Sequence, residues 1–196
     1  MIDRFYPVLP DITWLERLVP LGVRFVQLRV KDAPEREVRD QIARAMRLCA
    51  EHGAQLVVND YWQAAIDLGA DFVHLGQEDL AAADVPAIRQ AGIRLGVSSH
   101  DRAELAAALA TSPDYVALGP IYETRLKKMK WAPQGLERVA AWKQAISCPL
   151  VAIGGITVER APDVLAAGAD SIAVVTDLVT HPDPEARTRE WLAVLG

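Results

Sequence analysis

The stretch from Asn59 to Asp79, NDYWQAAIDLGADFVHLGQED, contains the unit that decides the fold. It starts at the end of a predicted strand over residues 55–59, passes through a short helical pattern, and reaches a second predicted strand over 72–75. Gly69-Ala70-Asp71 separates that helix from the second strand, as expected of a glycine placed just after a helix C-terminus. The stretch therefore predicts a strand–helix–strand unit with parallel strands.

The same unit repeats along the whole chain. Short apolar runs alternate with helical spacing, and we predict eight strands, over residues 5–8, 25–29, 55–59, 72–75, 94–98, 115–119, 150–154 and 171–175. Eight such units indicate an α/β fold, a single-domain (β/α)8 TIM barrel over residues 1–196, near the lower size limit of about 200 residues for this fold. The alternative is a doubly wound open sheet, but that fold usually has about five or six strands, and no G-x-G-x-x-G follows the first strand.

Composition restricts the class of protein. The chain has 196 residues, of which 51% are hydrophobic and 24% charged, as expected for one soluble domain. The first twenty residues carry several charges and no later apolar run has membrane-spanning length, so we expect a cytoplasmic protein with no membrane contact. A net charge of −5 argues against a nucleic-acid partner and leaves a homo-oligomer open. Cys49 and Cys148 lack metal-ligand spacing and are interpreted as unreactive thiols.

Two aspartates follow neighbouring predicted strands. Asp60 comes directly after the third strand, and Asp79 comes shortly after the fourth. Parallel neighbours lie about 4.8 Å apart and barrel active sites lie at the carboxyl ends of strands, so both carboxylates could reach one Mg²⁺ ion. Alternatively, the two acids make turns and cap helices, which is the commoner role of isolated aspartates.

The second strand combines an amide and two cations with an apolar face. Side chains alternate between the two faces of a strand, so Gln27, Arg29 and Lys31 point toward the barrel mouth. The other face points toward the helices and carries Val26, Leu28 and Val30. Charges inside a barrel mouth need partners, because burying an unpaired charge is costly. The partner is either an anionic ligand or, internally, Asp60.

Three loops after later strands could bind phosphate. Gly154-Gly155 follows the seventh strand and Val175-Thr176 the eighth, and these two loops commonly form a phosphate site in such barrels. Residues 119–130, GPIYETRLKKMK, form a long loop after the sixth strand, with four cations in its last six residues. This loop is either an ordinary solvated segment or a lid that supplies a phosphate ligand.

Ser98, Ser99 and His100 follow the fifth strand, but no nucleophile elbow or Ser-His-acid order accompanies them. Ser98 is therefore interpreted as a hydrogen-bonding residue. His74 lies inside the fourth strand, where a lone histidine is more often a packing residue with satisfied hydrogen bonds than a base.

Six segments in this order resemble one known family. They are QLRVKD (27–32), NDYW (59–62), HLGQED (74–79), GVSSH (96–100), the Gly119-Pro120 loop with Thr124 and Lys127, and AIGGI (152–156). From about residue 5 to residue 178 the chain resembles thiamine phosphate synthase in its proteobacterial form. The resemblance implies a (β/α)8 transferase that joins a hydroxymethylpyrimidine diphosphate to a thiazole phosphate and releases pyrophosphate.

The resemblance also implies a role for each matching residue. The pyrimidine diphosphate would be held by Gln27, Leu28, Arg29, Val30, Lys31, Asn59, Ser98 and Lys127. The thiazole phosphate would be held by Thr124, Arg125, Leu126, Gly155, Val175 and Thr176. Asp60 and Asp79 would bind Mg²⁺, and Arg29, Lys31 and Lys127 would neutralise the leaving pyrophosphate. Ser98 would be a fourth catalytic residue, through its contact with the pyrimidine substrate.

The chain departs from the family pattern at two positions. The family usually has a second threonine where this chain has Leu126, and a serine where it has Thr176. Two other functions fit the same scaffold. One is that of the aminothiazole tautomerase relatives, which need no diphosphate site, and the other is a non-catalytic sensor of thiamine intermediates. The tautomerase is disfavoured by the presence of a full set of diphosphate and metal residues, namely Arg29, Lys31, Asn59, Asp60, Asp79 and Lys127.

Overall fold

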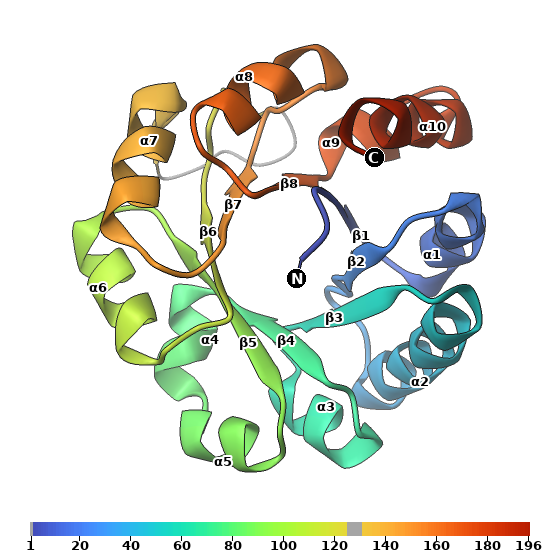
Figure 1. Cartoon of the computed structure of the whole chain (residues 1–196). Helices are drawn as coiled ribbons and strands as arrows, with labels where there is room; N and C mark the ends of the chain where they lie inside the picture. Colours follow the sequence, from blue (N-terminus) through green and yellow to red (C-terminus); the bar gives the residue numbers. More distant parts are fainter. Residues whose placement is uncertain (1, 125–130) are drawn as a thin grey trace.

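The fold is described by a computed structural model, which covers residues 2–124 and 131–196. Within these residues, eight parallel strands form a closed barrel in which each strand pairs with its neighbours in chain order (Figure 1). The strands are β1 (Phe5–Leu9), β2 (Phe25–Leu28), β3 (Gln55–Asn59), β4 (Phe72–Leu75), β5 (Arg94–Ser99), β6 (Tyr115–Leu118), β7 (Leu150–Ile153) and β8 (Ser171–Val174). The predicted TIM barrel is confirmed.

Helices surround the barrel and connect successive strands (Figure 1). The connections from β1 to β5 contain α1 (Ile12–Leu18), η1 (Val19–Leu21), α2 (Glu35–His52), α3 (Trp62–Leu68), α4 (Gln77–Ala82) and α5 (Val85–Gln90). The rest of the chain contains α6 (Arg102–Ala110), α7 (Gly135–Ala145), η2 (Val158–Arg160), α8 (Ala161–Ala166), α9 (Thr176–Val179) and α10 (Pro184–Leu195).

The predicted strand boundaries need small corrections. β3 and β4 have the predicted bounds, whereas each of the other strands ends one residue earlier or later than predicted. Arg29, which we placed inside the second strand, lies just beyond β2, although its N–H still donates to the Leu9 carbonyl at 2.8 Å. The strict alternation of strand and helix is also too simple, because two helices follow β4 and two follow β8.

The sequence signals at helix ends have the expected geometry. Gly69 ends α3 in the left-handed conformation, with φ of 74°, which glycine adopts without steric cost. Asp183 caps α10 by accepting from the Ala186 N–H, and Pro184 occupies the first turn. None of the helices among the described residues has the length and apolarity needed to cross a membrane.

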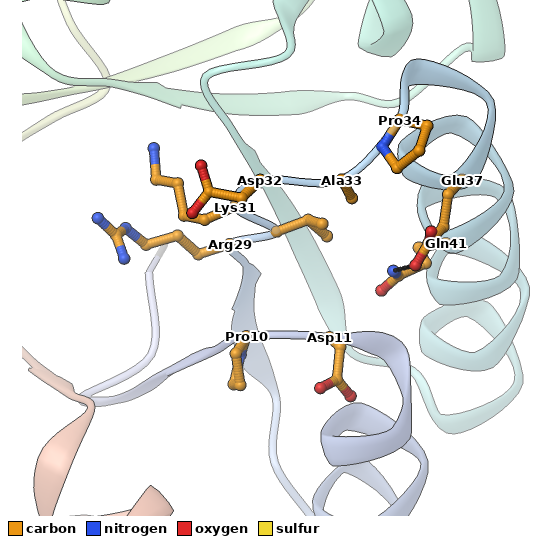
Figure 2. Close-up of a pocket in the computed structure, with 10 residues that line it drawn as sticks. Pro10, Asp11, Arg29, Lys31, Asp32, Ala33, Pro34, Glu37 and Gln41 are labelled. Atoms are coloured by element: carbon orange, nitrogen blue, oxygen red, sulfur yellow. Dashed lines mark hydrogen bonds between the residues drawn. The ribbon is translucent and has the colours of Figure 1, made fainter.

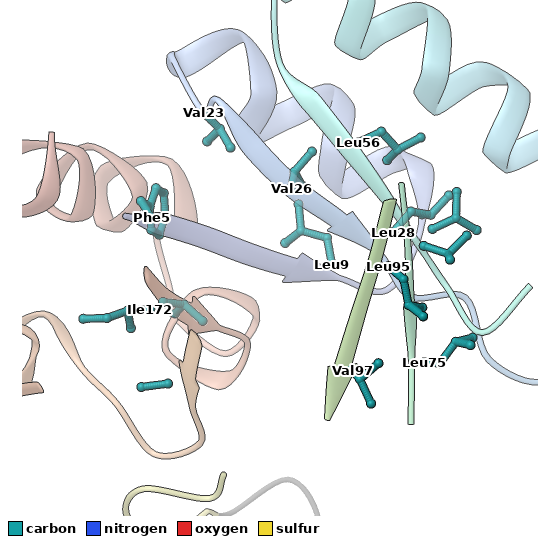
Figure 3. Close-up of a cluster of buried hydrophobic side chains, with 14 of the residues drawn as sticks. Phe5, Leu9, Val23, Val26, Leu28, Leu56, Leu75, Leu95, Val97 and Ile172 are labelled. Atoms are coloured by element: carbon teal, nitrogen blue, oxygen red, sulfur yellow. The ribbon is translucent and has the colours of Figure 1, made fainter. Parts of the chain in front are cut away.

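Two separate apolar cores hold the barrel together. The outer core lies between strands and helices and includes Val26, Leu28 and Val30, so the predicted helix-facing side of the second strand is confirmed (Figure 3 shows Val26 and Leu28). The inner core fills the barrel with four aromatic rings and five aliphatic side chains, from Tyr6, Val8, Phe25, Val57, Phe72, Tyr115, Ala117, Val151 and Ala173. The barrel interior is therefore filled below its mouth, and the carboxyl ends of the strands are where a barrel of this fold places its active site.

Candidate active site

Two cations stand at the end of β2. Arg29 is half-buried and Lys31 exposed, and both line a pocket of about 510 Å³ between the turn after β1 and the segment after β2. Figure 2 shows the two side chains extending in the same direction, away from Glu37 and Gln41 of α2. The predicted polar face of this strand is thus present, with Gln27 buried inside the barrel below the two cations.

Two residues of the same run point the other way. The side chains of Leu28 and Val30 are 2% and 4% exposed and belong to the outer core. Only their backbone groups could face a ligand in the mouth. The prediction that Leu28 and Val30 help to hold the pyrimidine diphosphate therefore stays a prediction about their backbone groups.

Asp60 and Asp79 form a close carboxylate pair. Lys31 Nζ lies 2.5 Å from Asp60 Oδ2, so the internal pairing considered for the second strand is present. Asp60 has a left-handed backbone, with φ of 64°, a conformation that aspartate tolerates better than most residues. The pKa of Asp79 is raised, first by burial and then by the charge of Asp60 and a hydrogen bond with it. The pair therefore carries negative charge that a cation could neutralise.

The donor set suits Mg²⁺ better than a softer metal. Among residues 2–124 and 131–196, no group of three or more His, Cys, Asp or Glu side chains could hold a metal ion. Two carboxylates alone fit a hard ion that keeps several waters and completes its shell with substrate phosphates. The residues present thus fit Mg²⁺.

Asn59 supplies an unused donor beside this pair. It ends β3, opposite His74 of β4, and its side chain is only 4% exposed. Its Nδ2 atom is the one buried side-chain nitrogen or oxygen, within the described residues, that has no hydrogen-bond partner. Leaving a buried donor unpaired costs about 1–3 kcal/mol, so an acceptor atom on a ligand would satisfy this donor.

A chain of side-chain hydrogen bonds crosses the barrel interior below the mouth. Gln27 Nε2 donates to the Tyr6 hydroxyl at 2.8 Å, and the Tyr6 and Tyr115 hydroxyls are 2.9 Å apart. The Tyr115 hydroxyl lies 2.8 Å from His74 Nδ1, and His74 Nε2 lies 2.8 Å from Ser98 Oγ. Five strands thus contribute one residue each to a line that ends at Ser98.

Burial controls the charge of His74. Its ring is 8% exposed and stacks on Tyr115 with an interplanar angle of 12°. Burial, partly opposed by Asp60, lowers the pKa of His74 to about 4. The predicted role as a satisfied packing residue is consistent with this neutral ring, but its bond to Ser98 also connects it to the site.

Sequence reasoning missed Tyr6 and Tyr115, as well as Gln77, which donates to the Ser98 carbonyl at 2.6 Å. A signal for the tyrosines was present. Both rings lie in predicted strands, and a buried tyrosine hydroxyl needs a hydrogen-bond partner. What the sequence could not supply is the register that brings β1 and β6 residues, 109 positions apart, into contact across the barrel.

The loop after β7 is packed against the loop after β6. Gly154 and Gly155 both have positive φ, 99° and 67°. A Cβ atom on Gly155 would lie 2.5 Å from the Glu123 carbonyl oxygen, and one on Gly154 would lie 2.7 Å from Pro120. Close packing of the two loops therefore accounts for both glycines, and the predicted phosphate contact at Gly155 would come in addition to this packing role.

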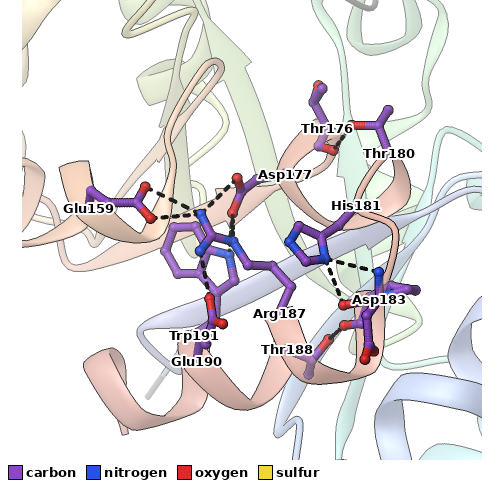
Figure 4. Close-up of polar contacts among 11 residues, drawn as sticks. Glu159, Thr176, Asp177, Thr180, His181, Asp183, Arg187, Thr188, Glu190 and Trp191 are labelled. Carbon is purple, nitrogen blue, oxygen red and sulfur yellow. Dashed lines mark hydrogen bonds and ion pairs between the residues drawn. The ribbon is translucent and has the colours of Figure 1, made fainter.

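An ion-pair cluster holds the loop after β8. Val175 is the N-cap of α9 and Thr176 is its first residue. The next residue, Asp177, accepts from Arg187 and from the Trp191 indole (Figure 4). The Arg187 side chain is 11% exposed and also pairs with Glu159 and Glu190. This cluster fixes the position of Thr176 relative to α10.

The remaining predicted residues lie in the loop after β6. Thr124 is half-buried and belongs to the described chain, whereas Arg125, Leu126 and Lys127 lie outside the described residues. The structure thus gathers Gln27, Arg29, Lys31, Asn59, Asp60, Asp79 and Ser98 on the β2–β5 side of the mouth and Thr124, Gly155, Val175 and Thr176 on the β6–β8 side.

Comparisons with known proteins identify the family. The thiamine monophosphate synthase model matches residues 7–178. The chain is 62% identical to a thiamine-phosphate synthase of Rhizobium etli over 98% of this chain and 95% of the relative, and 50% identical to one of Klebsiella pneumoniae over 97% and 91%.

A solved structure agrees with these relatives. The thiamine phosphate pyrophosphorylase of Pyrococcus furiosus is similar with a TM-score of 0.86 and 27% identity, covering 98% of this chain and 95% of that one. The resemblance predicted from the six segments is confirmed over nearly the whole chain. The chain belongs to the thiamine monophosphate synthase family.

Proposed function

We propose that this member of the family joins a hydroxymethylpyrimidine diphosphate to a thiazole phosphate, forming thiamine phosphate and pyrophosphate with Mg²⁺ as cofactor. The chain is an enzyme of thiamine biosynthesis by its family. The observation that supports this detailed reaction best is the grouping of Asp60 and Asp79 with Lys31 at one side of the mouth. Opposite charges side by side suit a metal–diphosphate group, which carries both.

In the proposed reaction the bond between the pyrimidine methylene carbon and the diphosphate oxygen breaks first. The electron pair leaves with the pyrophosphate, and the carbocation-like methylene is then attacked by the thiazole nitrogen, whose lone pair forms the new C–N bond. No covalent bond to the protein is needed. The protein's task is to neutralise the leaving group and to hold two substrates in line.

Each residue of the β2–β5 side has a task in this scheme. Asp60 and Asp79 would hold Mg²⁺, which when bound supplies positive charge beside the diphosphate oxygens. Arg29 and Lys31 would neutralise the leaving pyrophosphate, together with Lys127. Asn59 would donate a hydrogen bond from its unpaired Nδ2 to the substrate, and Ser98 would add a hydroxyl contact.

The β6–β8 side would hold the thiazole phosphate through Thr124 to Leu126, Gly155, Val175 and Thr176. This assignment follows the family pattern. The tight packing of the loops after β6 and β7 supports it, because this packing places Thr124 beside Gly154. A Cβ atom added to Gly154 would lie 3.4 Å from Thr124 Cγ2. A cytoplasmic location, and small-molecule substrates rather than nucleic acid or membrane as partners, complete the proposal.

One assay tests the proposal. The purified protein is mixed with both substrates, with Mg²⁺ or with a chelator, and thiamine phosphate and pyrophosphate are measured together. We expect equal amounts of both products with Mg²⁺ and loss of turnover with the chelator. Binding of both substrates without product would instead support the sensor, and isomerisation of the thiazole alone would support the tautomerase.

A further inference from the structure

The hydrogen-bond chain that ends at Ser98 has a direction, which can be read from its first member. Gln27 Nε2 is a hydrogen-bond donor only, so the Tyr6 oxygen must be the acceptor at 2.8 Å. The Tyr6 hydroxyl can then donate to the Tyr115 oxygen, 2.9 Å away. The opposite arrangement would make Tyr6 accept twice and leave its own proton unpaired in a buried site, which is costly.

The direction continues through the imidazole. Because the Tyr115 oxygen accepts from Tyr6, its single proton is free for His74 Nδ1 at 2.8 Å. His74 then accepts at Nδ1 and carries its proton on Nε2, which lies 2.8 Å from Ser98 Oγ. Ser98 Oγ accepts this hydrogen bond, so the Ser98 hydroxyl is itself free to donate into the mouth.

The rest of the barrel interior keeps this line rigid. Tyr115 occupies space that exists because residue 96 is glycine, since a Cβ there would lie 2.1 Å from Tyr115 Cζ. The backbone of Ser98 is held from the other side by Gln77 Nε2, 2.6 Å from its carbonyl oxygen. The inner core packs against both tyrosines, with the Tyr6 ring centroid 4.2 Å from that of Phe25 and the Tyr115 ring centroid 5.6 Å from that of Phe72.

We propose that His74 is a positioning residue that, as its Nε2–H tautomer, donates to Ser98 and thereby makes Ser98 a hydrogen-bond donor to the pyrimidine diphosphate. This deepens the function proposed above. Asn59 already presents one unused donor to the mouth, and Ser98 becomes a second one. Two fixed donors suit a ligand rich in acceptor atoms, such as a diphosphate ester, and would bind a cationic or donor-rich ligand poorly.

The first test reads the tautomer directly and needs no substrate. The protein contains four histidines, and ¹⁵N labelling of histidine with assignment through His74→Gln isolates the ring of interest. We expect the His74 spectrum to show a protonated Nε2 and an unprotonated Nδ1. Tyr115→Phe, which removes the donor to Nδ1, should change that pattern. A proton on Nδ1 in the wild-type protein would overturn the proposal, because Ser98 would then be the donor to His74.

A matched control is available in Tyr61→Phe. The Tyr61 ring packs against the outer core, so this change removes a tyrosine hydroxyl outside the chain of hydrogen bonds. The His74 spectrum should be unchanged in this variant. An equal change in Tyr61→Phe and Tyr115→Phe would mean that the spectrum responds to general loosening, and would count against the directed chain.

The second test compares single and double variants. Ser98→Ala and His74→Leu should each lower kcat/KM for the pyrimidine diphosphate by about tenfold, with the KM for thiazole phosphate unchanged. The double variant should be no worse than Ser98→Ala, because His74 acts through Ser98. His74→Gln, which keeps a donor near the Nε2 position, should recover most of the loss. Multiplied losses in the double variant would overturn the proposal.

The two tests separate this inference from the proposed function. If His74→Leu does not fold, as thermal unfolding would reveal, Tyr115→Phe replaces it in the kinetic comparison and keeps the ring in place. A wild-type protein that shows the expected tautomer but makes no thiamine phosphate would contradict the proposed reaction and leave the directed chain intact. A fully active wild-type protein with the opposite tautomer would contradict the directed chain and leave the proposed reaction intact.

Discussion

On the β2–β5 side of the barrel mouth, charged side chains are the main feature of the structure, whereas on the β6–β8 side the main feature is the shape of the backbone. The first side presents Asp60 in contact with two groups, the Lys31 ammonium and the Asp79 carboxyl. The second presents Gly154 and Gly155 at positive φ, packed against the β6 loop. The difference decides how each side can be disturbed. Removing a charged atom tests the first side, and adding a carbon atom tests the second.

The largest effect is expected from Asp60→Asn and Asp79→Asn on the side-chain half. Each variant removes one carboxylate charge with almost no change in shape, and asparagine also tolerates the left-handed backbone of residue 60. We expect kcat to fall by about 10²–10³-fold, the usual effect of losing one electrostatic contact to developing charge. Steady-state kinetics at saturating Mg²⁺ measures this.

Asp84→Asn is the control for these variants. Asp84 caps α5 by accepting from the Ala87 N–H, and asparagine caps equally well. Its turnover should equal that of the wild-type protein, and thermal unfolding should show all three variants folded. Wild-type rates in Asp60→Asn and Asp79→Asn would remove the metal assignment.

The next effect is expected from Gly155→Ala on the backbone half. An alanine at φ of 67° costs about 1–2 kcal/mol in strain, and its Cβ would also lie 2.5 Å from the Glu123 carbonyl oxygen. Gly92→Ala is the matched control, since it has φ of 74° and no atom within 4 Å of an added Cβ. Urea unfolding should show a larger loss of stability for Gly155→Ala than for Gly92→Ala.

The same pair of variants also tests, through the KM for each substrate, whether the two sides of the mouth bind different substrates. Gly155→Ala should raise the KM for thiazole phosphate and leave the KM for pyrimidine diphosphate unchanged, while Gly92→Ala should change neither. If both KM values rise together in Gly155→Ala, the loops after β6 and β7 support the whole mouth, and the division into two halves is wrong.

A smaller effect is expected at the brace behind Thr176. Asp177→Asn keeps an acceptor for the Trp191 indole but removes the charge paired with Arg187, whose side chain is 11% exposed. We expect a loss of about 1–2 kcal/mol in urea unfolding, below the usual cost of breaking a fully buried pair. Glu190→Gln removes an exposed partner of the same arginine and should cost less than about 1 kcal/mol. Equal losses would show that the cluster acts as one unit.

The fold was predictable because its signals are local. Apolar runs with helical spacing between them, and glycines such as Gly69, mark the units without any knowledge of distant contacts. Strand ends were less certain, because a single bond such as that from Arg29 N–H to the Leu9 carbonyl decides whether a residue counts as part of a strand.

The site was predictable only where side-chain chemistry shows in the sequence. Charges after strands, such as Asp60, could be recognised, and Lys31 was correctly considered as its partner. The hydroxyls of Tyr6 and Tyr115 look like ordinary strand residues, because their contact depends on strands that meet only when the barrel closes. The requirement for glycine at position 96 could not be predicted for the same reason, because it arises from the space that the Tyr115 ring occupies.

The smallest effect is expected from Leu126→Thr, at a position outside the described residues. A threonine there would restore the hydroxyl usual in the family, and one hydrogen bond to phosphate is worth about 0.5–1.5 kcal/mol. The KM for thiazole phosphate should therefore fall by up to about tenfold, with kcat unchanged. Leu126→Val, which has the shape of threonine without its hydroxyl, is the control and should leave KM at the wild-type value. An equal fall in both variants would assign the effect to side-chain size, and no change in either would mean that residue 126 does not contact the thiazole phosphate, so that the backbone alone defines this side of the mouth.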